Sequence, residues 1–147
     1  RELREIVDTA LVHIMLTNDM FSFRAEAMMD DYVNALSVLR LSEGLGLQEA
    51  VDRLFALVDG KRAEFMAARA AIEAGELGRR EDIRAYLDAL WHMMAGNLQW
   101  SYLTSRYNGP GHRWNGVRSG VLTLHRDRTV FSDRAYCSLP RAEEVPA

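Results

Sequence analysis

The sequence has little of several residue types, and each scarcity argues against a class of protein. Cys137 is the only cysteine among 147 residues, so the chain has no internal disulfide framework and suits a reducing compartment. No apolar run reaches the roughly 18 residues that a membrane-spanning helix needs. Lys61 is the only lysine, and the net charge of −3 provides no basic field for nucleic acid. We therefore expect a cytoplasmic protein with no membrane span and no nucleic-acid partner.

The composition and the hydrophobic periodicity predict one all-α domain. A chain that is 48% hydrophobic and 27% charged is ordinary for a globular domain, and its length suffices for one core. Three long helices are predicted over about residues 1–29, 47–74 and 80–107, with a short helix over about 31–41. We expect residues 1–108 to form the helical domain. Residues 109–147 read as an irregular tail with strand-like pieces at 121–125 and 129–131, a candidate flap over a site.

The periodicity also predicts which side chains are buried. We expect core-facing stripes on the second and third long helices, made by Leu47, Ala50, Val51, Leu54, Leu57 and Val58, and by Ile83, Tyr86, Leu87, Leu90, Met94, Leu98 and Ser101. His13 reads as a core histidine whose hydrogen bonds are satisfied. The opposing charges of Glu49 and Arg53 read as a solvated face. Asp30 and Asp31 favour a helix start there, and the alternative is that this acidic pair extends a metal site. Gly96 predicts a bend or a close contact.

The first helix carries three oxygen-bearing side chains at a spacing of four. Asn18, Ser22 and Glu26 drift by only about 40° per step, so they line one narrow stripe. An amide oxygen, a hydroxyl and a carboxylate are hard donors of the kind that Mg²⁺ takes. The alternative is that this stripe only marks where a core helix meets solvent.

The same stripe continues upstream with apolar side chains. Leu11 and Met15 belong to it, within the very apolar run 10–16, which predicts a helix that is buried on most faces. One face of the helix thus changes from apolar to oxygen-bearing. This change suits an apolar pocket with a cation at its mouth.

A second motif ends the third long helix. Arg106 is a permanent cation whose planar fork matches phosphate geometry, and Tyr107 beside it can donate a hydrogen bond. Trp100, six residues before Arg106, offers a large aromatic face. Taken alone, an arginine in the last turn of a helix usually serves the helix dipole. The chain then meets the helix stop 108–111, Asn-Gly-Pro-Gly.

The two motifs together resemble the class I terpene synthases of bacteria and fungi. The resemblance rests on N-D-x-x-S-x-x-x-E from Asn18 to Glu26, on W-x-x-x-x-x-R-Y from Trp100 to Tyr107, and on the intervening stretch 30–54. It implies an all-α class I terpenoid synthase bundle of which this chain is the C-terminal half. It also implies a carbon–oxygen lyase of isoprenoid biosynthesis that ionises and cyclises a prenyl diphosphate.

The resemblance assigns a role to each residue of the motifs. It implies that Asn18, Ser22 and Glu26 bind one Mg²⁺ of a three-ion cluster, and that Arg106 and Tyr107 contact the substrate diphosphate. Asp19 belongs to the motif without being a ligand. The resemblance implies that Trp100 lines the pocket near the carbocation. Phe21 and Tyr102 are weaker candidates, and plain core packing is the alternative for these aromatic side chains. Met15 and Asn97 are also expected to line the pocket.

The chain departs from the family pattern in two ways. Many members have a lysine just before the motif's glutamate, where this chain has Ala25, with Arg24 beside it. The family's aspartate-rich motif and its diphosphate-sensing arginine lie well upstream of the position of Asn18. The chain opens at Arg1 within a helical pattern, so we expect these upstream parts in a missing N-terminal half of the domain.

The expected partners follow from the resemblance. They are a linear prenyl diphosphate (geranyl, farnesyl or geranylgeranyl) and the missing N-terminal half, and a homodimer stays open. The rival readings are a non-catalytic all-α interaction module and a degenerate protein that binds a prenyl diphosphate without turnover.

Overall fold

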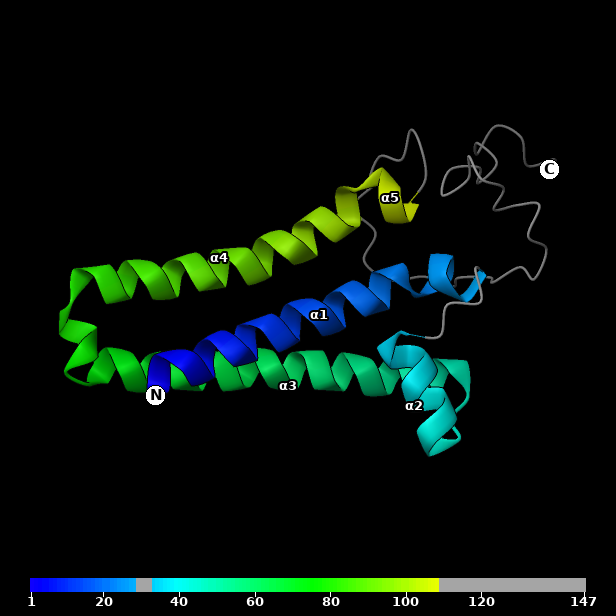
Figure 1. Cartoon of the computed structure of the whole chain (residues 1–147), viewed down its shortest axis with the longest axis horizontal. Helices are drawn as coiled ribbons and strands as arrows, with labels where there is room; N and C mark the ends of the chain where they lie inside the picture. Colours follow the sequence, from blue (N-terminus) through cyan, green and yellow to red (C-terminus); the bar gives the residue numbers. More distant parts are fainter. Residues whose placement is uncertain (29–32, 109–147) are drawn as a thin grey trace.

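The computed structural model describes residues 1–28 and 33–108, and for Ala25, Ala27 and Met28 it describes the backbone alone. Its elements are α1 (Glu2–Met28), α2 (Ala35–Glu43), α3 (Leu47–Ala74), the 3₁₀ turn η1 (Leu77–Arg79), α4 (Glu81–Leu103) and α5 (Ser105–Asn108) (Figure 1). All of these described elements are helical, which confirms the all-α prediction. The predicted tail and its two strand-like pieces fall outside the described residues.

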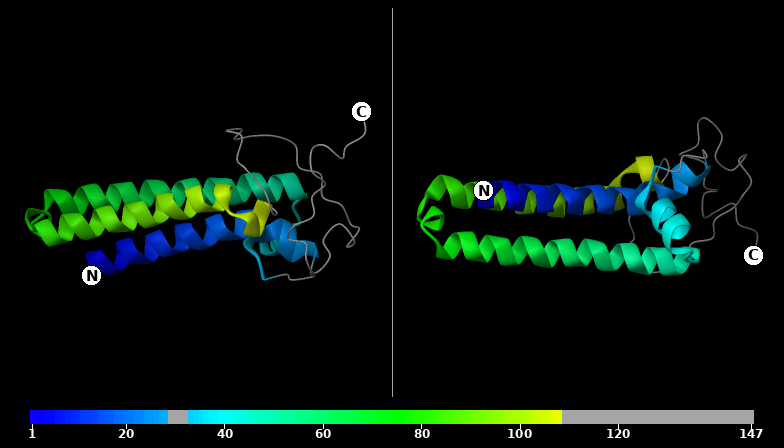
Figure 2. Two further views of the ribbon diagram at one scale, coloured as in Figure 1. Left: turned by 90° about the horizontal axis from the view of Figure 1, so that it is seen from above. Right: turned by 60° about the horizontal axis from the view of Figure 1, so that its bottom comes forward.

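The three long helices lie side by side, and α1 packs against both of the others (Figures 1 and 2). α3 runs antiparallel to α1, and α4 returns parallel to α1 after the turn at η1. α2 and α5 lie beside the C-terminal part of α1, at the opposite end from η1. We call the η1 end of the bundle the far end and the α2–α5 end the site end.

The far end holds an apolar core. Its fully or nearly buried members come from all three long helices: Ile6, Ala10, Phe65, Ile72, Ile83, Leu87, Leu90 and Met94. The rings of Phe65 and Trp91 stack at 6.2 Å between α3 and α4. At about 25 cal/mol per Å² of apolar surface removed from water, this burial is the main force that holds the three helices together.

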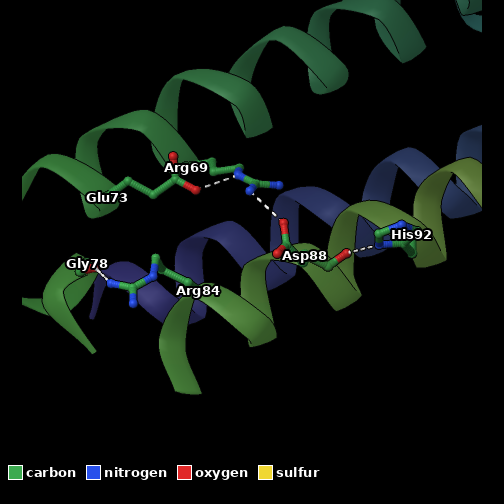
Figure 3. A network of polar contacts seen from close by, with 6 residues as sticks. All are labelled: Arg69, Glu73, Gly78, Arg84, Asp88 and His92. Atoms are coloured by element: carbon green, nitrogen blue, oxygen red, sulfur yellow. Dashed lines mark hydrogen bonds and ion pairs between the residues drawn. The ribbon is translucent and has the colours of Figure 1, made fainter. Parts of the chain in front are cut away.

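Polar contacts close the turn at the far end (Figure 3). Arg69 of α3 pairs with Glu73 at 2.8 Å and with Asp88 of α4 at 2.6 Å. Arg84 donates to the carbonyl oxygen of Gly78 at 2.6 Å. A Cβ added at Gly78 would collide with the backbone oxygen of Glu73, so the close approach of η1 to α3 requires glycine there.

The site end has a smaller apolar core, which joins α1, α2 and α3 through Phe23, Leu36, Ala50 and Leu54. On α1, two polar side chains lie buried between the two cores, His13 and Thr17. Neither His13 Nδ1 nor Thr17 Oγ1 makes a hydrogen bond within the described part of the chain. The prediction that His13 is buried is confirmed, whereas the prediction that its hydrogen bonds are satisfied is wrong for Nδ1.

The predicted helices agree with the observed ones except at two ends. α3 has the predicted bounds, but α2 begins at Ala35 instead of near residue 31, because Asn34 caps it. The third long helix stops at Leu103, where Thr104 is extended, and the chain resumes as α5. α4 is continuous through Gly96, and a Cβ there would meet nothing within 4 Å, so Gly96 marks no close contact. Asp30 and Asp31 fall outside the described residues.

Several burial predictions need correction. Tyr86 and Leu98 are exposed, because α1 and α3 cover a narrower arc of α4 than the periodicity marks as apolar. Other members of the α4 stripe, Ile83, Leu87, Leu90, Met94 and Ser101, are buried as predicted.

Glu49 and Arg53 are both exposed, which confirms the predicted solvated face, but the two side chains contact other residues and not each other. Glu49 instead accepts a hydrogen bond from the Gly46 amide at the start of α3. Arg53 lies 3.8 Å from the Glu43 carboxylate.

Candidate metal and diphosphate site

The predicted metal stripe lies on the last turns of α1, facing the start of α2. The Asn34 side-chain nitrogen donates to Glu26 Oε2 at 2.7 Å and reaches Ser22 Oγ at 3.4 Å. The hydroxyl and the carboxylate therefore both lie within hydrogen-bond reach of one nitrogen atom, so the Ser22 and Glu26 side chains are close together. Among the described residues no group of three His, Cys, Asp or Glu side chains converges, so a cation here would depend on amide and hydroxyl oxygens as well.

The third member of the stripe contacts the second motif. The hydroxyl of Tyr107 donates to Asn18 Oδ1 at 2.5 Å, from α5 to α1, across 89 positions of the sequence. Two motifs that were recognised separately thus meet at one end of the bundle. This is the contact expected if both serve one site.

A break between α4 and α5 places Tyr107. The α4 helix is closed by the Thr104 amide, which donates to the carbonyl oxygen of Trp100 at 2.8 Å. The side chain of Asn108 then donates to the carbonyl oxygens of Ser101, Tyr102 and Thr104. These are carbonyls at the end of α4 or just beyond it, and one amide satisfies them. The sequence identified Asn108 only as part of a stop signal, and this role was missed.

Aromatic rings surround Tyr107. The Tyr107 ring lies 5.5 Å from that of Trp100, edge to face, and 6.5 Å from that of Phe21. Phe21 also meets Tyr102 edge to face at 5.0 Å. The Arg106 guanidinium carbon lies 5.8 Å from the centre of the Tyr107 ring, within the range of a cation–π contact. Arg106 itself is exposed, so its charge is accessible to an anion.

The apolar part of the stripe is exposed, contrary to the prediction of a helix buried on most faces. Leu11 is 50% and Met15 54% exposed, because α3 and α4 cover only the other sides of α1. Trp100 on α4 is 45% exposed. Asn97 is half-buried, and its amide nitrogen lies 3.4 Å from the carbonyl oxygen of Ile14, where it joins α4 to α1.

Asp19 lies near Glu26 of the predicted metal stripe, and its predicted exclusion from the ligands stays a prediction. Its carboxylate accepts a hydrogen bond from the Ala35 amide at 2.8 Å. Burial raises the pKa of Asp19, the nearby Glu26 raises it further, and the bond from Ala35 opposes both.

Burial likewise lowers the pKa of Arg24, which is half-buried on α1. The side chain of Ala25, the position where many family members have lysine, is outside the described part of the structure.

Comparison with known proteins identifies the family of the chain. A family model described as "Terpene synthase family 2, C-terminal metal binding" matches residues 1–64. Microbial Terpene synthase-like protein 13 of Selaginella moellendorffii is 38% identical over 126 residues, which cover 83% of this chain and 34% of that protein. The chain belongs to the terpene synthase family. Pristinol synthase of Streptomyces pristinaespiralis is 34% identical over 138 residues, 84% of this chain and 36% of that synthase.

The match is to a part of these relatives. The chain spans about a third of the length of the curated synthases that it matches, including (+)-germacrene D synthase of Selaginella moellendorffii, 28% identical over 83% of this chain and 35% of that synthase. The name of the matching family model supports a bound metal. Within the described residues, no helix combines the length and the apolar character that crossing a membrane requires.

Proposed function

We propose that the protein is a class I terpene synthase, which ionises and cyclises a linear prenyl diphosphate and releases diphosphate. The observation that carries this proposal is the hydrogen bond from Tyr107 to Asn18, because it joins the candidate metal motif to the candidate diphosphate motif. The names of the similar proteins, such as pristinol synthase, agree with a terpene product.

The donor set of α1 fits Mg²⁺. Asn18, Ser22 and Glu26 supply three hard oxygens on one stripe, and two of them already converge on the Asn34 amide. When bound, Mg²⁺ would neutralise charge on the departing diphosphate. The rest of a three-ion cluster would need ligands beyond these three side chains.

Arg106 and Tyr107 are proposed to hold the diphosphate. The guanidinium of Arg106 is exposed at the end of the bundle, where its planar fork can bind phosphate oxygens in pairs. The Tyr107 hydroxyl lies against Asn18, so a diphosphate that it contacts would sit beside the metal motif. Both groups stabilise the negative charge that develops as the allylic C–O bond breaks.

The pocket for the hydrocarbon is proposed along the exposed side of α1 and α4. Met15 and Trp100 present apolar surface there, with Phe21 and Asn97 nearby along the same helices. Aromatic faces stabilise a carbocation by about 0.5–2 kcal/mol each. The N-terminal half of the domain would cover this side and exclude water, which would otherwise quench the cation.

The proposed location of the protein is the cytoplasm, because a single cysteine suits a reducing compartment.

Product analysis by gas chromatography and mass spectrometry tests the proposal. The full-length protein is incubated with geranyl, farnesyl and geranylgeranyl diphosphate, with and without Mg²⁺. A terpene hydrocarbon or alcohol that forms only with Mg²⁺ is expected, and the substrate that yields it defines the chain length. Absence of product from all three substrates would contradict the synthase proposal.

Thermal stabilisation separates the rival functions. A synthase and a degenerate binding protein should both gain stability from Mg²⁺ with inorganic diphosphate, since a ligand of the folded state raises the melting temperature. An interaction module should gain none. Stabilisation without product would identify the degenerate binder and direct attention to Ala25, the departure within the motif.

A further inference from the structure

We infer that Asn34 positions the metal ligands Ser22 and Glu26. The inference rests on the proposed metal site, and it adds a residue outside both recognised motifs. Asn34 immediately precedes α2 and is only 2% exposed. Its amide points into the stripe of α1 (Glu2–Met28), where the cation is proposed to bind.

Both the oxygen and the nitrogen of the Asn34 side-chain amide form hydrogen bonds, and the two atoms have different functions. The oxygen accepts a hydrogen bond from the Leu36 amide at 2.8 Å and so caps α2. The nitrogen donates to the backbone oxygen of Asp19 at 2.8 Å and to Glu26 Oε2 at 2.7 Å, with Ser22 Oγ at 3.4 Å. Helix capping needs only the oxygen, so the donor half is available for the carboxylate.

A second bond fixes the same junction. The Ala35 amide donates to Asp19 Oδ2 at 2.8 Å. The side chain of Asp19 on α1 and the side chain of Asn34 just before α2 therefore join the two helices. These contacts hold the Asn34 nitrogen in place independently of Glu26. A donor that is fixed in this way can select the orientation of a glutamate, whose side chain otherwise loses considerable rotamer entropy when it is ordered.

The consequence concerns metal affinity. A hydrogen bond to one oxygen of a carboxylate orients the group and leaves its other oxygen for a cation. Outer-shell partners of this kind typically contribute 10–100-fold to metal affinity. Asn34 has the burial, the geometry and the fixed backbone that such a partner needs.

The test compares two substitutions, one at the residue just before α2 and one within α2. Asn34→Ser keeps a side-chain oxygen for the cap but is too short to bridge Asp19 and Glu26. Leu36→Ala, the matched control, loosens the packing of the 1% exposed Leu36 and leaves the Asn34 amide intact. Binding of Mn²⁺ to the full-length protein is followed by the loss of the free-ion signal in electron paramagnetic resonance. Glu26→Ala identifies which sites belong to this motif.

We expect Asn34→Ser to lower the affinity of the Glu26-dependent Mn²⁺ site by about 10-fold or more. Leu36→Ala should lower this affinity by less than about 3-fold, although the Leu36→Ala protein melts at a lower temperature. Wild-type affinity in Asn34→Ser, or an equal loss in both variants, would overturn the positioning role. Tighter binding in Asn34→Ser would overturn it too, since the amide would then compete with the cation. If Glu26→Ala removes no Mn²⁺ site, the proposed metal motif itself fails, and this inference fails with it.

Discussion

The two ends of the bundle are built by different means. At the far end, apolar side chains such as Ile6, Phe65 and Leu87 are fully buried, and charged pairs such as Arg69 with Asp88 lie at the surface. At the site end, the apolar core is small, and amide groups form hydrogen bonds with carboxylate and hydroxyl groups. The same helix, α1, contributes to both ends.

This difference shows how a long helix can serve two purposes. Burying polar groups costs free energy unless each finds a partner, so a polar end contributes less to stability than an apolar one. The far end supplies rigidity through packing. The site end can then hold polar side chains, with Asn34 and Tyr107 as their hydrogen-bond partners.

The largest expected effect is the loss of the metal-binding carboxylate. Glu26→Ala should lower kcat/KM for the prenyl diphosphate by more than about 100-fold, since even outer-shell partners of metals contribute 10–100-fold. Steady-state product formation measures it. The matched control is Glu73→Ala at the far end, where an ion pair with Arg69 is lost and stability changes by about 1 kcal/mol or less. Turnover above a tenth of wild type in Glu26→Ala would contradict the metal assignment.

The next effect should appear in stability alone. Gly78→Ala is expected to lower the free energy of unfolding by more than about 2 kcal/mol, because its Cβ would collide with the backbone of Glu73. Urea unfolding measures the loss. Gly60→Ala is the control: its Cβ meets nothing within 4 Å inside α3, so it should stabilise the protein by up to about 1 kcal/mol. Equal stability of the two variants would refute the described turn.

A smaller effect is expected where the two motifs meet. Tyr107→Phe removes the donor to Asn18 and should lower kcat/KM by about 10-fold, the equivalent of one lost hydrogen bond in a partly buried site. Kinetics with the substrate identified by product analysis would measure it. Tyr86→Phe, at an exposed tyrosine of α4, serves as control and should leave kcat/KM unchanged.

The smallest effect concerns pH and the boundary between the two cores. Burial, and secondarily the charge of Arg62 on α3, lowers the pKa of His13 below its ordinary value of 6.5. As pH falls below about 6.5, the unfolded chain binds a proton before the folded protein does. The free energy of unfolding therefore decreases until pH reaches the folded pKa, by at most about 1.4 kcal/mol per pH unit.

Urea unfolding between pH 8 and pH 5 measures this dependence. His13→Leu should flatten the pH dependence of the free energy of unfolding below pH 6.5. Near pH 8 the slope of this dependence should be the same in the variant and in the wild type. An unchanged slope in His13→Leu would mean that another group carries the acid sensitivity.

Much of the fold was predictable, because amphipathic periodicity is a local property of the sequence. The bounds of α3 and the length of α1 follow from it directly. The break at Thr104 was not predictable, since the contacts of Asn108 that stabilise it depend on tertiary structure. The exposure of Leu11 and Met15 was missed because an apolar run does not reveal how many neighbours cover it.

The candidate site was predictable from residue spacing and from the family resemblance, but its internal contacts were not. The spacing of Asn18, Ser22 and Glu26 indicates one helix face whatever the fold. Nothing local indicates that Tyr107 reaches Asn18. An asparagine just before a helix is an ordinary capping signal, so the sequence alone gave Asn34 no link to Glu26.

Hydrogen–deuterium exchange on the full-length protein tests the division between the two ends most directly. Peptides are compared with and without Mg²⁺ and inorganic diphosphate. We predict slower exchange in residues 18–28, in the start of α2 and in α5, and unchanged exchange around η1 and the adjoining turns of α3 and α4. Protection that appears at the far end, or at neither end, would contradict the assignment of ligand binding to the site end, where Tyr107 meets Asn18.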